Sequence, residues 1–131
     1  MTCSLSACVL PAYTTLQPAS RMTVRDERGA PLKGATVTLI ATTTPYGLEA
    51  HRETKTTDAN GQAAFDQRNE WRTEAPFLLH GVQSFSWSWC ISKAGYATHR
   101  TWREGSSEFD PAPVVRLSPG PSSECPKPEA W

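Results

Sequence analysis

The side chains that could do chemistry in this 131-residue chain are four cysteines and three histidines. His51, His80 and His99 fall in three separate segments, and no Cys-x-x-Cys or Cys/His spacing typical of a zinc site occurs. The sequence also contains no Gly-x-Ser-x-Gly nucleophile motif and no glycine-rich phosphate loop. It therefore offers no candidate catalytic residue, metal ligand set or cofactor site, and we expect a protein that is not an enzyme.

The first cysteine with a recognisable context is Cys8, which ends the segment Leu5-Ser-Ala-Cys8. This segment resembles a bacterial lipobox, in which the cysteine is lipidated after cleavage before it, so the chain would be held to a membrane through its N-terminal lipid. Residues 1–7 supply neither the charged nor the apolar region of a signal peptide. We expect Met1 to be an internal start within a longer signal peptide, or the sequence to be truncated; the alternative is a chance match in a disordered tail.

The remaining cysteines predict a disulfide. If Cys3 is removed with the signal and Cys8 carries lipid, Cys90 and Cys125 are left as an even pair in an oxidising compartment. A bridge between them would close a loop of about 35 residues and pin the C-terminal tail onto the sheet. The alternative is two unpaired thiols.

Composition indicates one domain between extended flanks. Thirteen basic and thirteen acidic residues cancel and form no long block, so neither a nucleic-acid partner nor a polybasic membrane patch is expected. The prolines cluster toward the two ends. We therefore divide the chain into a signal remnant, lipobox and tether (1–20), a β-sandwich domain (21–117) and a Pro-rich tail (118–131), with residues 9–17 as the tether.

The strand pattern predicts an all-β fold, and its strongest segment is Phe85 to Ser92. Trp87 and Trp89 fall on one face of it with the other large apolar side chains, whereas Cys90 falls on the serine-rich face. The aromatic face should form the centre of the core. Further strands are expected at residues 22–26, 35–42, 49–57, 62–65, 97–103 and 114–117, with 49–57 as a charged edge strand.

The order of the motifs resembles the carboxypeptidase regulatory-like domains, relatives in fold of transthyretin and of the collagen-adhesin B repeats. The matching residues are Val24-x-Asp26-x-x-Gly29-x-Pro31-Leu32-x-Gly34-Ala35-x-Val37-x-Leu39, Thr57-Asp58-x-x-Gly61-x-x-x-Phe65, and the Trp87, Trp89, Ile91 strand followed by Gly95-Tyr96. The resemblance implies a seven- to eight-stranded Greek-key β-sandwich that usually acts as a non-catalytic module.

One segment departs from that pattern. Residues 66–81 are too long for a hairpin turn and have no clean period, so we expect a functional loop. Its apolar side chains either pack beneath the sandwich or form an exposed contact surface. We expect Trp71, Phe77 and Leu79 to bind a partner, together with Tyr46 from the loop at residues 43–50.

These features favour a non-catalytic lipoprotein of the bacterial cell envelope that faces the periplasm and binds a protein or glycan. Val9 after the lipid cysteine favours the outer membrane under enterobacterial-type sorting. An immunity lipoprotein against a periplasmic toxin is a second hypothesis. A hydroxyisourate hydrolase-like enzyme is a third, because transthyretin-like folds include such enzymes, but their C-terminal Tyr-Arg-Gly-Ser is replaced here by Pro-Lys-Pro-Glu-Ala-Trp.

Overall fold

A computed structural model of the chain describes residues 10–44, 47–74 and 84–127. The described part is all-β, as predicted, and contains no helix long and apolar enough to cross a membrane. Its nine strands are β1 (Leu10–Gln17), β2 (Ser20–Arg25), β3 (Thr36–Thr44), β4 (Glu49–Thr56), β5 (Gln62–Phe65), β6 (Arg68–Glu74), β7 (Ser84–Lys93), β8 (Tyr96–Arg100) and β9 (Val114–Arg116).

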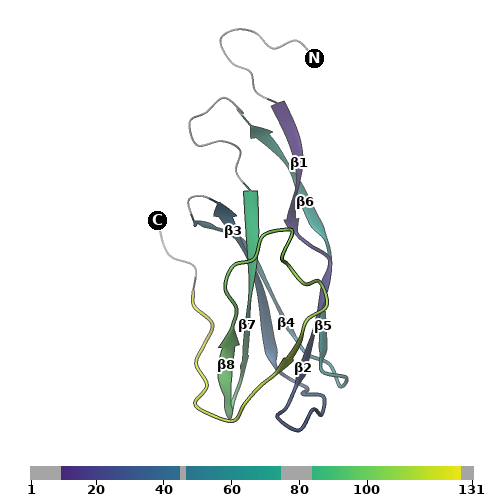
Figure 1. The fold of residues 1–131 in the computed structure, drawn as a ribbon, viewed down its shortest axis with the longest axis vertical. Helices are drawn as coiled ribbons and strands as arrows, with labels where there is room; N and C mark the ends of the chain where they lie inside the picture. The colour runs from purple at the N-terminus through teal and green to yellow at the C-terminus, as the bar shows by residue number, and fades with distance from the viewer. Residues whose placement is uncertain (1–9, 45–46, 75–83, 128–131) are drawn as a thin grey trace.

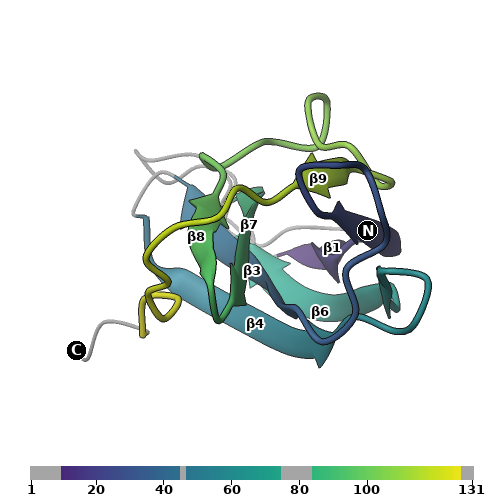
Figure 2. The ribbon, with the colours of Figure 1, turned by 90° about the horizontal axis from the view of Figure 1, so that it is seen from below.

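The strands form a sandwich with an attached ribbon (Figure 1). One sheet has the order β4-β3-β7-β8 and the second has the order β5-β2-β9, while β1 and β6 pair only with each other. The β2–β9 pair is parallel and the remaining named pairs are antiparallel. Figure 2 views the molecule from its lower end, with β4, β3, β7 and β8 in one layer and β9 on the other side of the core. The charged strand β4 lies at a sheet edge, as predicted.

The core follows from the alternation along β7. Phe85, Trp87, Trp89 and Ile91 are all buried, which confirms the predicted inward face. The Trp89 ring meets Phe65 of β5 edge-on at 5.4 Å between centroids, so the two sheets are joined by an aromatic contact.

Two Asp-to-Gly turns have the same geometry. The Asp26 carboxylate accepts hydrogen bonds from the backbone N–H groups two and four residues later, and Gly29 N–H donates to the Asp26 carbonyl. Asp58 and Gly61 repeat each of these bonds. Both glycines have positive φ, 85° at Gly29 and 74° at Gly61, a conformation in which glycine avoids the steric cost of a side chain.

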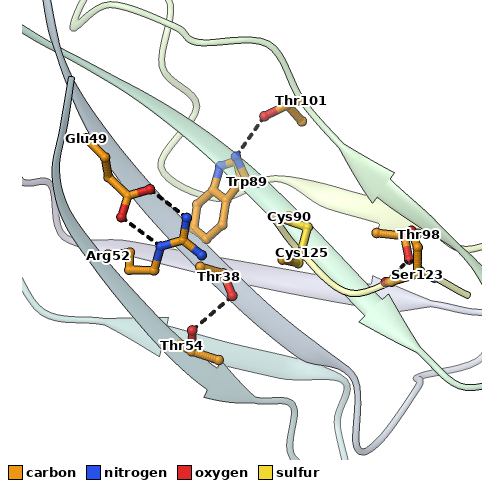
Figure 3. Close-up of a disulfide and its surroundings, with 10 residues drawn as sticks. All are labelled: Thr38, Glu49, Arg52, Thr54, Trp89, Cys90, Thr98, Thr101, Ser123 and Cys125. Carbon is orange, nitrogen blue, oxygen red and sulfur yellow. Dashed lines mark hydrogen bonds and ion pairs between the residues drawn. A yellow bond between two sulfur atoms is a disulfide. The ribbon is translucent and has the colours of Figure 1, made fainter. Parts of the chain in front are cut away.

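The C-terminal tail returns along the outer side of β8 (Figure 1). Thr98 Oγ1 donates to the Ser123 carbonyl at 2.6 Å and accepts from the Ser123 N–H at 2.9 Å. Cys125 then forms a disulfide with Cys90, across a sequence separation of 35, as predicted (Figure 3). Cys90 is on the outer face of its sheet, yet it is only 1% exposed because the tail covers it.

Two predicted segments were wrong. Residues 9–17 were expected to be a tether, but Leu10–Gln17 is strand β1. Residues 66–81 were expected to be a loop without regular structure, but Arg68–Glu74 is strand β6, which pairs with β1. A paired strand therefore begins before residue 21, the predicted start of the domain. The two sheets of the sandwich contain seven strands, and β1 and β6 raise the number of strands to nine.

Gly61 is the turn position most sensitive to substitution. An alanine Cβ there would lie 2.4 Å from the Val24 carbonyl oxygen, in addition to the cost of positive φ. Gly95 has φ of 86° but open space around it. We expect Gly95→Ala to lower the free energy of unfolding by about 1–2 kcal/mol and Gly61→Ala by at least about 3 kcal/mol, measured by urea denaturation. Equal losses would contradict a role for close backbone packing at Gly61.

Candidate functional site

The β1–β6 ribbon continues the β2–β5 pairing beyond the sandwich (Figure 1). Gln17 lies opposite Arg68, and Ser20 lies opposite Phe65, so each strand advances three residues and the register is kept across the interruption. Pro18 lies in this gap and has no N–H to donate. The buried Gln17 side chain donates from Nε2 at 2.8 Å to the carbonyl of Asp66, which lies between β5 and β6, so this backbone acceptor has a partner within the interruption.

A β-bulge fixes the ribbon to the core. The register shifts between Thr15 and Gln17, which takes Leu16 out of the regular ladder. The Leu16 carbonyl accepts a hydrogen bond from Trp87 Nε1 at 2.9 Å, and the Leu16 side chain packs against the core. The bulge thus supplies the partner that a buried indole N–H needs.

A second attachment joins the ribbon to the edge strand β4. The Glu53 carboxylate accepts from Gln17 Nε2 at 3.1 Å and from Arg68 Nη2 at 2.7 Å, the latter also an ion pair. Burial alone would raise the pKa of Glu53. The hydrogen bonds from Arg68 and Gln17, with the charges of Arg68 and Lys55, outweigh burial and lower this pKa below its ordinary value of 4.5. The carboxylate therefore stays ionised and holds both ribbon strands to β4.

The ribbon carries an exposed aromatic pair. Tyr13 and Trp71 lie opposite each other in register, with ring centroids 4.9 Å apart and planes tilted by 38°. Tyr13 is 62% exposed and Trp71 is 72% exposed. Because exposed aromatic faces lose favourable burial, a paired set held in place on a strand ladder is a candidate contact surface. Its rings could stack against the apolar face of a sugar or against side chains of a protein partner.

The predicted partner-binding residues are placed only in part. Trp71 is exposed, so the alternative in which it packs beneath the sandwich is wrong. Tyr46, Phe77, Leu79 and the predicted lipidation site Cys8 lie outside the described residues. Tyr13 was missed because its segment was expected to be a tether.

The histidines do not gather into one site within the described part of the chain. His51 is in β4 and His99 is in β8, strands at opposite edges of the four-stranded sheet. Three strand spacings place them at least about 14 Å apart across the sheet, and the register offsets them further along the strands, so they are too far apart to share one metal ion or one reacting atom. His80 lies outside the described residues.

Comparisons with models of known protein families, with curated proteins and with solved structures gave no match for this chain. The resemblance to carboxypeptidase regulatory-like and transthyretin-like domains, and the Greek-key topology that it implies, therefore remain predictions. The aromatic pair is a candidate site because of its exposure and its position on the ribbon, and no similarity to another protein supports it.

The lowered pKa of Glu53 predicts a specific acid sensitivity. The unfolded chain binds a proton at Glu53 more readily than the folded chain, so this contribution to stability is complete above the unfolded pKa. It is lost as the pH falls from about 5 through the lower folded pKa.

We expect Glu53→Gln to flatten the decrease in unfolding free energy between about pH 5 and pH 3, measured by urea denaturation. The exposed Glu108→Gln should keep the wild-type decrease. A Glu53→Gln protein with an unchanged acid limb would contradict the role of the Gln17–Glu53–Arg68 contacts.

Proposed function

We propose that this protein is a non-catalytic cell-envelope lipoprotein that binds a protein or glycan partner through the Tyr13–Trp71 pair. The observation that carries the binding proposal is the solvent exposure of two adjoining aromatic rings at 62% and 72%. Aromatic residues are enriched among the few interface residues that dominate binding energy. The lipobox-like Leu5-Ser-Ala-Cys8 carries the proposal of a lipid anchor.

The pair is preorganised for binding. An isolated two-stranded ribbon is at best marginally stable in water. Here the Trp87–Leu16 hydrogen bond and the contacts of Glu53 with Gln17 and Arg68 fix the ribbon to the sandwich. A surface that is already ordered loses little conformational entropy when a partner docks, so more of the contact energy appears as affinity.

The proposed anchor puts this surface near a membrane. Tyr13 follows Cys8 by five residues, so even a fully extended chain separates their Cα atoms by at most about 18 Å. With Val9 favouring the outer membrane, the pair would work in the periplasm close to the inner leaflet of that membrane. A partner in the envelope, either a membrane-associated protein or the cell-wall glycan, is within reach of such a surface.

The binding proposal is tested with two exposed tryptophans. Trp71→Ala and Tyr13→Ala remove the pair, and Trp102→Ala removes an 81% exposed indole outside the ribbon. We expect the two ribbon variants to lose at least about tenfold in affinity while staying folded, because the rings are exposed and their cross-strand contact contributes at most about 1 kcal/mol to stability. Trp102→Ala should bind like the wild type. The measurements are crosslinked pull-down from envelope fractions for a protein partner, a toxin included, and co-sedimentation with cell-wall sacculi for a glycan. Full retention of the partner by Trp71→Ala would contradict the proposal.

The lipid anchor has its own test, which is independent of binding. We expect mass spectrometry of the natural protein to find a mature N-terminus at Cys8 carrying diacylglycerol and an acyl chain. Cys8→Ala should move the protein from the membrane fraction to the soluble fraction. An unmodified chain that begins at Met1 would overturn the lipoprotein proposal and leave the aromatic surface to be judged separately.

A further inference from the structure

A pocket of about 170 Å³ opens on the outer face of the four-stranded sheet, the face turned away from the core. Residues of β3, β4 and β7 form its floor, Ile40 and Ser88 among them. Its other sides are lined by Arg100, Thr101 and Arg103 and by Pro126 and Lys127 near the C-terminus. A water molecule occupies roughly 30 Å³ in the liquid, so the pocket has room for a small polyatomic ligand.

The charge of the lining is strongly one-sided. Four basic side chains line the pocket beside a single carboxylate, that of Glu49, which leaves three net positive charges there in a chain with no net charge overall; the four are Arg52, Arg100, Arg103 and Lys127. Like charges gathered around one hollow repel each other and weaken the fold unless an anion neutralises them. The lining therefore favours an anionic occupant.

Among the described residues, one of these four cations is paired with a carboxylate. Arg52 Nε and Nη2 donate to the two carboxylate oxygens of Glu49 at 2.8 and 2.5 Å (Figure 3). In the described part of the chain, no carboxylate lies within ion-pair distance of Arg100, Arg103 or Lys127. Three positively charged groups are thus free to donate to a ligand, while Glu49 holds Arg52 in a fixed orientation at the pocket.

The Cys90–Cys125 disulfide positions the C-terminal residues that form one side of this pocket. Cys90 lines the floor and is bonded to Cys125 (Figure 3). In the sequence, Cys125 directly precedes Pro126 and Lys127. The paired hydrogen bonds between Thr98 and Ser123 hold the preceding residues of the tail against β8. The ammonium group of Lys127 therefore reaches the pocket because the disulfide returns the tail to β7.

We propose that this outer-face pocket binds a phosphate group, either free or as a monoester, and that the Cys90–Cys125 disulfide completes the site by holding Lys127 beside it. Guanidinium groups match the oxygens of phosphate in planar, two-bond geometry, and lysine adds a compact charge. Carboxylates share the same hydrogen-bond geometry. A dianion neutralises more of the three net charges than a monocarboxylate does, so phosphate is the favoured ligand. The inference does not rest on the proposed function.

The test is a titration of the full chain at constant ionic strength, kept with chloride, by isothermal calorimetry and by shifts of amide NMR signals. The probes are inorganic phosphate, glycerol 3-phosphate as a monoester, and acetate as a monocarboxylate. We expect saturable phosphate binding with a Kd on the order of millimolar. Shifts should cluster around Ser88 and Arg100, and acetate should bind at least about tenfold more weakly. Binding of glycerol 3-phosphate as tightly as phosphate would identify esters as ligands, and much weaker binding would identify the free anion.

Matched arginine variants localise the effect. Arg100→Gln with Arg103→Gln should weaken phosphate binding about tenfold, because exposed charge pairs each contribute modestly. Arg21→Gln with Arg25→Gln removes two exposed arginines of β2, outside the pocket, and should change the Kd less than twofold. Equal binding by both double variants, or a response to phosphate that never saturates, would overturn the site.

The disulfide arm tests the second half of the proposal. Cys90→Ser with Cys125→Ser should weaken phosphate binding, and so should Lys127→Gln, which leaves the disulfide intact. The two changes should be non-additive when combined, because both remove the same ammonium group from the pocket. Wild-type affinity in the Lys127→Gln protein would show that the tail takes no part in the site.

Discussion

Strand β7 holds both the β1–β6 ribbon and the C-terminal tail in place. Its side chains point alternately to the core and to the outer face of the sheet, and each face holds one of these two segments. On the inner face, Trp87 and Trp89 are buried, and the indole N–H of Trp87 bonds to the Leu16 carbonyl. On the outer face, Cys90 is joined to Cys125. A buried indole N–H without a partner would be costly, so the ribbon is held by the same residue that fills the core.

The ribbon combines a firm attachment with an exposed apolar surface. Gln17 is 1% exposed and bridges the interruption in the ladder, while Glu53 joins it and Arg68 to β4. These polar contacts order the strands without burying the rings of Tyr13 and Trp71. The two rings stay exposed on an ordered ribbon, and this is the physical reason that we propose the pair as a contact surface.

The sequence allowed the sandwich to be predicted but not the ribbon, for a reason visible in particular residues. Strands with one buried face show alternation, as Phe85 to Ile91 does, and the Asp26 and Asp58 turns follow from residues that favour positive φ. Arg68–Glu74 is rich in charge because it packs against a single strand, and Leu10–Gln17 contains Pro11, which an edge position tolerates. Neither segment has a hydrophobic period. Extending the β2–β5 register outward would have paired them, since Gln17 and Arg68 keep that register.

The aromatic pair and the outer-face pocket are held in place by different kinds of bond, so acid and reducing agents should affect them differently. The aromatic pair relies on hydrogen bonds and an ionised Glu53, so acid weakens its support while reduction leaves its contacts in place. The outer-face pocket relies on a covalent link to position Lys127. The ribbon attached at the inner face of β7 is thus held partly by a contact that protons weaken, and the tail on the outer face of β7 is held by a bond that thiols cleave.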